Sequence, residues 1–393
     1  MKNKKILICL HDITTAIQII TYLEQYKFNS KQYDFCILLN SDNITYAFKC
    51  DVKYLFRNYK VKILEFHFKE FRIFSLYNFF KWYEIFLLNR FYRKKIKLFL
   101  KKNSIKISSF SEILYSNDRL SNYLTYNFKK KLYFFHGVGD FKIFTKVNLL
   151  RRYKNLFFNY LNRYINKVQI PNINDNFTSI YINELKFKNL NSNKLNLNNE
   201  IFKKKFTEYY KFKKISFNKQ LNKKYILFLL KFPRYNPRAK KFLKKKFINA
   251  YFTFLLNNII STIKKNIKYR NLSLLIKTKN NLSTWEKKIL QTIIKKKFKK
   301  DSINLYSNSK KSFINAEFLA FNKNCHLLIS NFSTTDFIIK KLRPKMKIWS
   351  YIYLTHNFYK NNFTYYQKEF MQIKLIYNLN PIIKAKNFYK HIK

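Results

Sequence analysis

Short apolar runs alternate along the chain with longer segments in which apolar residues recur at helical spacing. The first run covers residues 5–10, a segment of helical period follows over 14–26, and a second run covers 35–39. Apolar runs separated in this way are typical of buried strands in βαβ units. Further strands are predicted at 61–66, 112–115 and 132–135. The first part of the chain is therefore expected to form a largely parallel sheet covered by helices.

A long aromatic segment, residues 71–100, has helical period and ends in a basic run at 90–95. The recurring apolar side chains are Ile73, Leu76, Tyr77, Phe80, Leu87, Leu88 and Phe91. One interpretation is a core helix with a solvated end. The other is contact with an anionic membrane through basic and aromatic side chains.

The pattern loosens between residues 169 and 223, with an Asn-rich stretch at 189–199. Alternation then restarts, with strands predicted at 225–230, 272–276, 303–306 and 326–329 and helices at 247–263 and 284–298. These two halves predict two α/β sheet domains facing across a cleft. The predicted limits are 1–170 for the first domain, 171–222 for a linker, 223–360 for the second domain, and 361–393 for a helical tail packing back.

The charge balance changes this picture little. Lys and Arg number 80 against 20 Asp and Glu, a formal net charge of +60 that is permissive for nucleic acid, anionic lipid or acidic polymer. Abundant Lys, Asn, Ile, Phe and Tyr beside only 2 Gly and 5 Pro is also the usage of an AT-rich genome. The charge therefore defines no partner by itself, and we do not expect nucleic acid to be one.

The cysteines and the hydrophobic runs indicate a cytoplasmic protein. Four well-separated cysteines contain no CxxC pair, so we expect free thiols in a reducing compartment and no zinc site. The apolar run at 6–10 is too short for a signal peptide and is interpreted as the first strand. No stretch of about 18 apolar residues supports a membrane span.

Both glycines of the chain follow one predicted strand. Gly137 and Gly139 come directly after the strand at 132–135, where open α/β sheets bind ligands. A backbone without a side chain there permits positive φ or close approach of a ligand. His136 is the candidate general base and Asp140 its supporting carboxylate; the alternative is a hydrogen-bonded structural histidine.

The other histidines lack such surroundings in the sequence and are taken as background: His11, His67, His326, His356 and His391. Among these, His11 is the weakest case for a background role because it ends the first predicted strand. No metal ion and no cofactor are expected.

In the second half, polar residues follow two predicted strands. Lys277 and Lys279 supply two cations that are able to neutralise phosphate. Ser333 and Thr334 stand between a strand and a helix, where hydroxyls and free N–H groups bind anions or simply cap the helix. Glu317 at a helix start is expected to hold ribose hydroxyls or to complement the helix dipole.

At these residues the chain resembles the bacterial capsule polysialyltransferase and lipooligosaccharide sialyltransferase family, from about residue 5 to residue 353. The family carries an acidic-acidic-Gly motif, a Lys-x-His-Pro element and a Ser-Ser pair. The corresponding stretches are Phe-His-Gly at 135–137, Lys-Thr-Lys-Asn at 277–280 and Ser-Thr at 333–334. The resemblance implies two Rossmann-like domains of the GT-B type that bind a CMP-activated sialic acid in the cleft.

The expected function is therefore transfer of a sugar, sialic acid or a related nonulosonic acid, from a CMP-activated donor to a cell-surface glycan acceptor. His136 is expected to deprotonate the acceptor hydroxyl, while Lys277, Lys279, Ser333 and Thr334 stabilise the departing phosphate. The protein is expected in the cytoplasm, with possible peripheral contact with the anionic inner membrane.

Two alternatives stay open. A histidine followed by glycine also resembles polymerases that transfer glycerol phosphate from CDP-glycerol. A non-enzymatic polyanion-binding protein would explain the charge, but it gives no purpose to the paired glycines and clustered hydroxyls.

Overall fold

The structure is a computed structural model. It describes residues 3–29, 31–40, 46–66, 80–116, 118–134, 160, 164–165, 176–179, 194–213, 221–230, 241–278, 284–298, 302–306, 314–331, 333–351 and 354. The chain divides into two compact units, Met1–Tyr209 and Tyr210–Lys393. The domain limits given above stay a prediction, and the tail at 361–393 lies outside the described residues.

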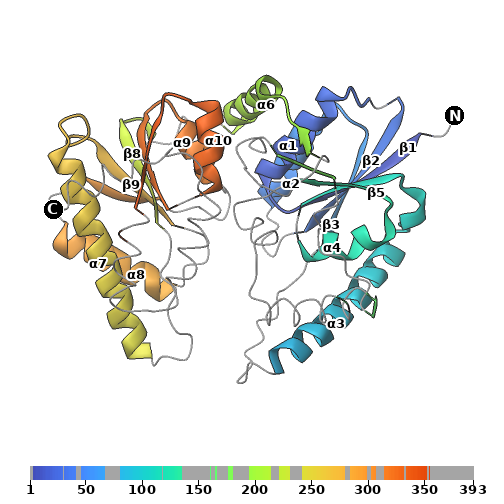
Figure 1. Cartoon of the computed structure of the whole chain (residues 1–393), viewed down its shortest axis with the longest axis horizontal. Helices are drawn as coiled ribbons and strands as arrows, with labels where there is room; N and C mark the ends of the chain where they lie inside the picture. The colour runs from blue at the N-terminus through green and yellow to red at the C-terminus, as the bar shows by residue number, and fades with distance from the viewer. Residues whose placement is uncertain are drawn as a thin grey trace. The chain divides into compact units, whose positions relative to one another are not determined.

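The first unit contains one parallel sheet. Its elements are β1 (Lys4–Leu10), α1 (Ile13–Gln25), β2 (Tyr33–Asn40), α2 (Tyr46–Leu55), β3 (Val61–Phe66), α3 (Phe80–Lys102), η1 (Ile107–Ser109), β4 (Glu112–Tyr115), α4 (Arg119–Leu124), η2 (Thr125–Asn127), β5 (Lys130–Phe134), β6 (Asn176–Ser179), β7 (Lys194–Asn196) and the start of α6 (Asn199–Phe212). The strand order is β3-β2-β1-β4-β5-β6-β7. Figure 1 shows α1 and α2 on one side of this sheet and α3 and α4 on the other. Strands β6 and β7 lie in the range 171–222 that was expected to be a linker.

The sequence explains why β1 is an interior strand of this sheet. All five residues from Ile6 to Leu10 are fully buried, as expected for a strand covered on both faces. Directly after the strand, Asp12 caps α1 by accepting a hydrogen bond from the backbone N–H of Thr15 at 2.9 Å. Strand order reverses beside β1, with β2 on one side and β4 on the other. Such a switch point is where open α/β sheets bind ligands.

The second unit repeats the arrangement with a smaller parallel sheet. Its elements are the end of α6 and then β8 (Tyr225–Leu230), α7 (Lys241–Lys265), β9 (Ser273–Thr278), α8 (Thr284–Lys297), β10 (Ile303–Tyr306), α9 (Ala316–Phe321), β11 (Cys325–Ser330), α10 (Thr334–Leu342) and β12 (Lys347–Ser350). The strand order is β10-β9-β8-β11-β12. Helices α7 and α8 lie on one side of the sheet and α9 and α10 on the other (Figure 1). Two Rossmann-like α/β units are therefore present, as predicted.

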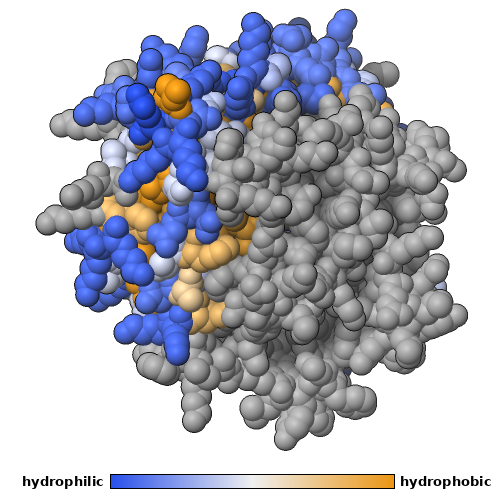
Figure 2. Space-filling model, turned by 60° about the vertical axis from the view of Figure 1, so that its left-hand side comes forward, coloured by the Kyte–Doolittle hydropathy of each residue, from blue (hydrophilic) through white to orange (hydrophobic). Residues whose placement is uncertain are grey.

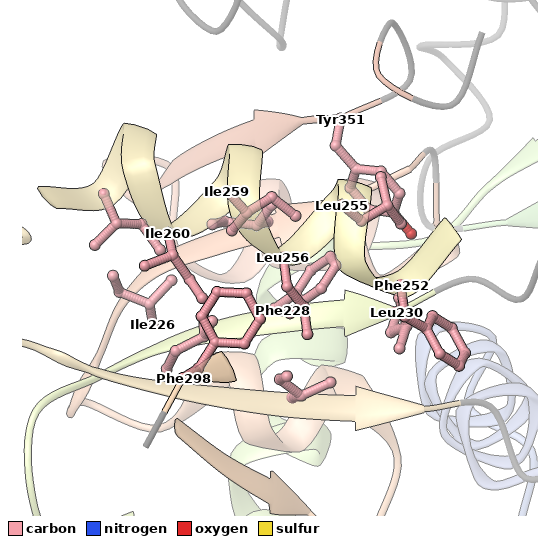
Figure 3. Close-up of a cluster of buried hydrophobic side chains, with 14 of the residues drawn as sticks. Ile226, Phe228, Leu230, Phe252, Leu255, Leu256, Ile259, Ile260, Phe298 and Tyr351 are labelled. Atoms are coloured by element: carbon pink, nitrogen blue, oxygen red, sulfur yellow. The ribbon is translucent and has the colours of Figure 1, made fainter. Parts of the chain in front are cut away.

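The core of the second unit lies between α7 and the sheet. Phe252, Leu256 and Ile259 of α7 are fully buried, and Figure 3 shows Leu256 beside Phe228 of β8 and Phe252 beside Leu230. This packing explains why α7 is apolar over most of its length although it begins and ends with lysines. Outside the cores, Figure 2 shows mostly hydrophilic side chains among the coloured residues, with a smaller hydrophobic patch.

The cysteines are free thiols, as predicted, and Cys9, Cys36 and Cys325 are buried. Burial raises the pKa of Cys325 to about 12, so this thiol is a protonated core side chain at neutral pH. Among the described residues, no helix combines the length and the apolar character needed to cross a membrane.

The packing of α7 predicts a large difference between two identical substitutions. Ile259 is 0% exposed and Ile267, in the loop after α7, is 80% exposed. Ile259→Ala should lower the free energy of unfolding of the second unit by about 2–5 kcal/mol, because it leaves a cavity. Ile267→Ala should change it by less than about 0.5 kcal/mol. Denaturant unfolding of both variants measures this, and equal effects would contradict the described core.

Candidate functional site

A polar cluster occupies the switch point of the first unit. His11 follows β1 and Ser116 follows β4, and the Ser116 hydroxyl lies 2.7 Å from His11 Nδ1. Two carboxylates flank the imidazole: Asp118 Oδ2 is 3.7 Å from Nδ1 and Asp12 Oδ2 is 3.7 Å from Nε2. His11 is still 19% exposed, so a ligand is able to reach it.

Asp118 is the buried member of this cluster. Its Oδ1 accepts hydrogen bonds from the Ser121 backbone N–H at 2.8 Å and from the Asn40 side-chain amide at 3.1 Å. Its Oδ2, 3.7 Å from His11 Nδ1, has no hydrogen-bond partner among the described residues. Burial raises the pKa of Asp118 to about 6, against the opposing effect of these hydrogen bonds. At neutral pH the side chain is a carboxylate that would favour a positive charge on His11.

This arrangement suits proton transfer at His11. In the tautomer whose Nδ1–H donates to the Ser116 hydroxyl, Nε2 is the basic nitrogen of the ring. The Asp118 carboxylate then stabilises the resulting imidazolium. The sequence analysis placed His11 in the background, and the structure shows surroundings that this interpretation assumed to be absent. The available signal was a His-Asp pair directly after the first strand.

The glycine turn predicted to carry the chemistry lies outside the described residues. This applies to His136, Gly137, Gly139 and Asp140. The strand that leads to them is described: β5 ends at Phe134 and pairs in parallel with β4. The catalytic role of His136 stays a prediction.

In the second unit, Lys277 lies near the end of β9 and is almost fully buried. Its Nζ is 5.1 Å from the centroid of the Tyr306 ring at the end of β10. Burial lowers the pKa of Lys277 to about 8, and the nearby Glu317 carboxylate opposes this shift. Lys277 is therefore a cation with a weakened hold on its proton. Lys279, its predicted companion, lies outside the described residues.

Glu317 connects Lys277 to the start of α10. It lies in the first turn of α9, as predicted, and is buried. Its Oε1 accepts a hydrogen bond from the Thr335 hydroxyl at 3.0 Å. The Ser333 hydroxyl in turn lies 3.1 Å from the Thr335 hydroxyl. A ribose contact by Glu317 stays a prediction, because one of its oxygens already serves Thr335.

The three hydroxyls before and in α10 have different tasks. Ser333 is the N-cap, and its backbone N–H donates to Asp336 Oδ2 at 3.0 Å in a capping box. Thr335 is buried, whereas Ser333 and Thr334 are partly exposed. Helix capping therefore explains the role of the Ser333 hydroxyl. The hydrogen bond to Glu317 explains the role of the Thr335 hydroxyl. Thr334 stands at the first turn of the helix, where free N–H groups favour an anion.

The Asp336 side chain stabilises the junction between β11 and α10. Its Oδ2 accepts a hydrogen bond from the Ser330 hydroxyl at 2.6 Å, inside the protein. Burial raises the pKa of Asp336 to about 6, and within the described part of the chain its other oxygen, Oδ1, has no hydrogen-bond partner. The sequence analysis did not single out Ser330 or Asp336. Within the described part of the chain, no three His, Cys, Asp or Glu side chains gather in a way that would hold a metal ion.

Comparison with known proteins gives no family. No protein-family model matches the chain, and no curated protein matches it. Similar solved structures include a glycosyltransferase from Rickettsia africae ESF-5, at 12% identity, a TM-score of 0.40 and coverage of 100% of this chain and 94% of that one. Acinetobacter baumannii MurG has 8% identity, a TM-score of 0.35 and coverage of 99% and 94%. Anabaena Alr3699/HepE, solved with UDP and glucose, has 8% identity, a TM-score of 0.40 and coverage of 88% and 80%. At such values the likeness concerns the fold alone.

The proximity of Glu317 to Lys277 predicts a measurable shift in the pKa of Lys277. Glu317→Gln removes the nearby negative charge, so the pKa of Lys277 should fall further below about 8. Acetylation of Lys277 as a function of pH, followed by mass spectrometry, measures this. Glu65→Gln, which removes the ion-pair partner of Lys49, is the matched control and should leave Lys277 unchanged. A Lys277 that titrates near 10.5 in the unaltered protein would contradict the described burial.

The hydrogen bond from Asn40 predicts a pH-dependent loss of stability. It favours the ionised form of Asp118, so its contribution is present above the pKa of about 6 and is lost as pH falls below it. Asn40→Ala should lower the free energy of unfolding by about 1.5–3 kcal/mol at pH 8 and by much less at pH 4.5. Asn29→Ala, at an exposed turn, is the control. An equal loss at both pH values would contradict the assignment.

Proposed function

We propose that this chain is a glycosyltransferase that moves a sugar from a nucleotide-activated donor to an acceptor hydroxyl. The observation that carries the proposal is the linked set of Lys277, Glu317, Thr335 and Ser333 at the carboxyl ends of the second sheet. It joins a cation to hydroxyls at a helix N-terminus, which is the chemistry that binds a phosphate group.

Phosphate is the part of the donor that gains negative charge when the sugar leaves. In this proposal Lys277, Ser333 and Thr334 stabilise that charge, together with Lys279. Burial lowers the pKa of Lys277, and the negative charge of a phosphate beside it would raise that pKa again. Lys277 would therefore be most firmly protonated where the negative charge of the leaving phosphate develops. Such stabilisation is generally the largest contribution to catalysis of this kind.

The acceptor hydroxyl requires a base, and two histidines of the first unit are candidates for this role. Geometry favours His11, because Asp118 and Ser116 orient it and balance its charge. The resemblance favours His136, supported by Asp140, beside Gly137 and Gly139. In the sequence His11 follows β1 and His136 follows β5. Replacing each histidine separately therefore distinguishes the two assignments.

The sequence resemblance suggests which donor and which acceptor the protein uses. The resemblance at 135–137, 277–280 and 333–334 supports a CMP-activated sialic acid or related nonulosonic acid, transferred to a cell-surface glycan on the cytoplasmic side of the membrane. CDP-glycerol is the competing donor, since His136-Gly137 also fits that chemistry. Both share the cytidine nucleotide and the phosphate that the second unit would hold.

Transfer assays with CMP-sialic acid and CDP-glycerol, offered separately with an oligosaccharide acceptor, test this function. Replacing the true base by Ala should lower kcat/KM by about a hundred- to ten-thousand-fold, because general-base catalysis is lost. His11→Ala and His136→Ala are compared with His326→Ala, a histidine in the second unit that is the control. Folding of each variant is checked by thermal unfolding. Full transfer activity in both His11→Ala and His136→Ala would exclude histidine base catalysis, and no transfer from either donor would exclude both donor assignments.

A further inference from the structure

Helix α3 carries an exposed apolar stripe that the proposed function does not use. Leu87, Phe91 and Leu98 are 43%, 42% and 59% exposed, respectively. Their spacing of four and seven residues places them on one face of the helix. The buried side chains Tyr92 and Ile96 lie on the opposite face. The helix is therefore anchored by one apolar face and presents a second one to solvent.

Cations flank this stripe. Arg90, Lys94 and Lys97 line a shallow groove of about 530 Å³ together with Leu87 and Phe91. Seven of the thirteen residues 90–102 are Lys or Arg, and none is acidic. In the part of the chain that the structure describes, no carboxylate forms an ion pair with these seven side chains. The described part of this helix is therefore strongly positive.

A second segment adds exposed apolar groups beside α3. The Arg93 guanidinium donates a hydrogen bond to the Ile165 carbonyl at 2.6 Å, which holds this segment next to the helix. Ile165, Tyr160 and Tyr164 are all exposed. The two tyrosine rings lie 4.3 Å apart, centroid to centroid. Tyrosines and basic residues together are typical of a surface at the boundary between water and lipid.

We infer that this surface, named here the α3 face and made of Leu87, Arg90, Phe91, Lys94, Lys97 and Leu98, docks onto an anionic membrane. Charge complementarity selects a negative surface, because the lysines and arginines of this helix are attracted to anionic headgroups. The apolar stripe selects lipid over a soluble polyanion, since only a membrane buries Leu and Phe while its headgroups meet the cations. The contact is peripheral and independent of which donor the enzyme uses.

Co-sedimentation with vesicles tests this surface. The protein should bind vesicles of phosphatidylcholine with about one third phosphatidylglycerol, and bind pure phosphatidylcholine at least about tenfold more weakly. The triple variant Leu87→Ser, Phe91→Ser, Leu98→Ser keeps every charge and should lose about tenfold or more in affinity for the anionic vesicles. Its binding to heparin, a soluble polyanion, should be unchanged.

A charge-matched control separates this face from the general basicity of the chain. Arg90→Gln, Lys94→Gln, Lys97→Gln is compared with Lys295→Gln, Lys296→Gln, Lys297→Gln on α8, where the lysines are exposed but the neighbouring Leu290 and Ile293 are buried. The α3 variant should lose vesicle binding much more strongly than the α8 variant. Equal losses, failure of the unaltered protein to bind anionic vesicles, or undiminished vesicle binding by the Leu/Phe→Ser variant would overturn the inference. Thermal unfolding confirms that each variant is folded.

Discussion

Parallel strand pairing is the constraint on which the rest of this structure depends. Every described pair in both sheets is parallel, so the carboxyl ends of neighbouring strands meet at one edge. In the first sheet the register pairs Cys9 with Tyr115, and His11 and Ser116 follow directly at that edge. In the second sheet the same rule brings Lys277 and Ser330 to the edge where α10 begins. Residues far apart in the chain become neighbours because of strand direction alone.

The ends of these strands also hold ionisable side chains whose charged forms are disfavoured by burial. Burial raises the pKa of Asp118 and Asp336 to about 6 and lowers that of Lys277 to about 8. A folded protein retains such groups only with polar partners, and here Asn40, Ser330 and Glu317 provide them. Perturbed pKa values at the strand ends of an α/β sheet are a feature of functional sites. In the first unit this group is Asp118, beside His11, and in the second unit it is Lys277, beside Glu317.

The sequence was most informative where apolar runs were short and bounded. The predicted strands at 61–66, 112–115, 225–230 and 303–306 have the observed bounds, because buried parallel strands need continuous apolar residues. Helix α6 was missed although Phe202, Phe206 and Tyr209 recur at helical spacing, since the Asn-rich stretch before it indicated a loop. The three-residue β7 and the half-polar β12 were too short for a periodic signal.

The position of a residue within its element was predictable where one local stretch carried the information. Glu317 at a helix start and Ser333 before α10 were predicted from their neighbours in the chain, and the structure places both there. The setting of His11 was not predictable in this way, because Asp118 and Ser116 reach it only through the pairing of β1 with β4. The task of Thr335 likewise depends on a carboxylate from another helix.

We propose that the second unit holds the phosphate of a cytidine nucleotide at Lys277. The most direct test is the thermal stability of the protein with CMP, CDP, UDP or DNA, at low and high salt. A cytidine nucleotide should raise the unfolding temperature at both salt concentrations, and Lys277→Gln should abolish the rise while Lys323→Gln, at an exposed lysine, preserves it. Stabilisation by any polyanion that disappears at high salt and ignores Lys277→Gln would contradict the claim.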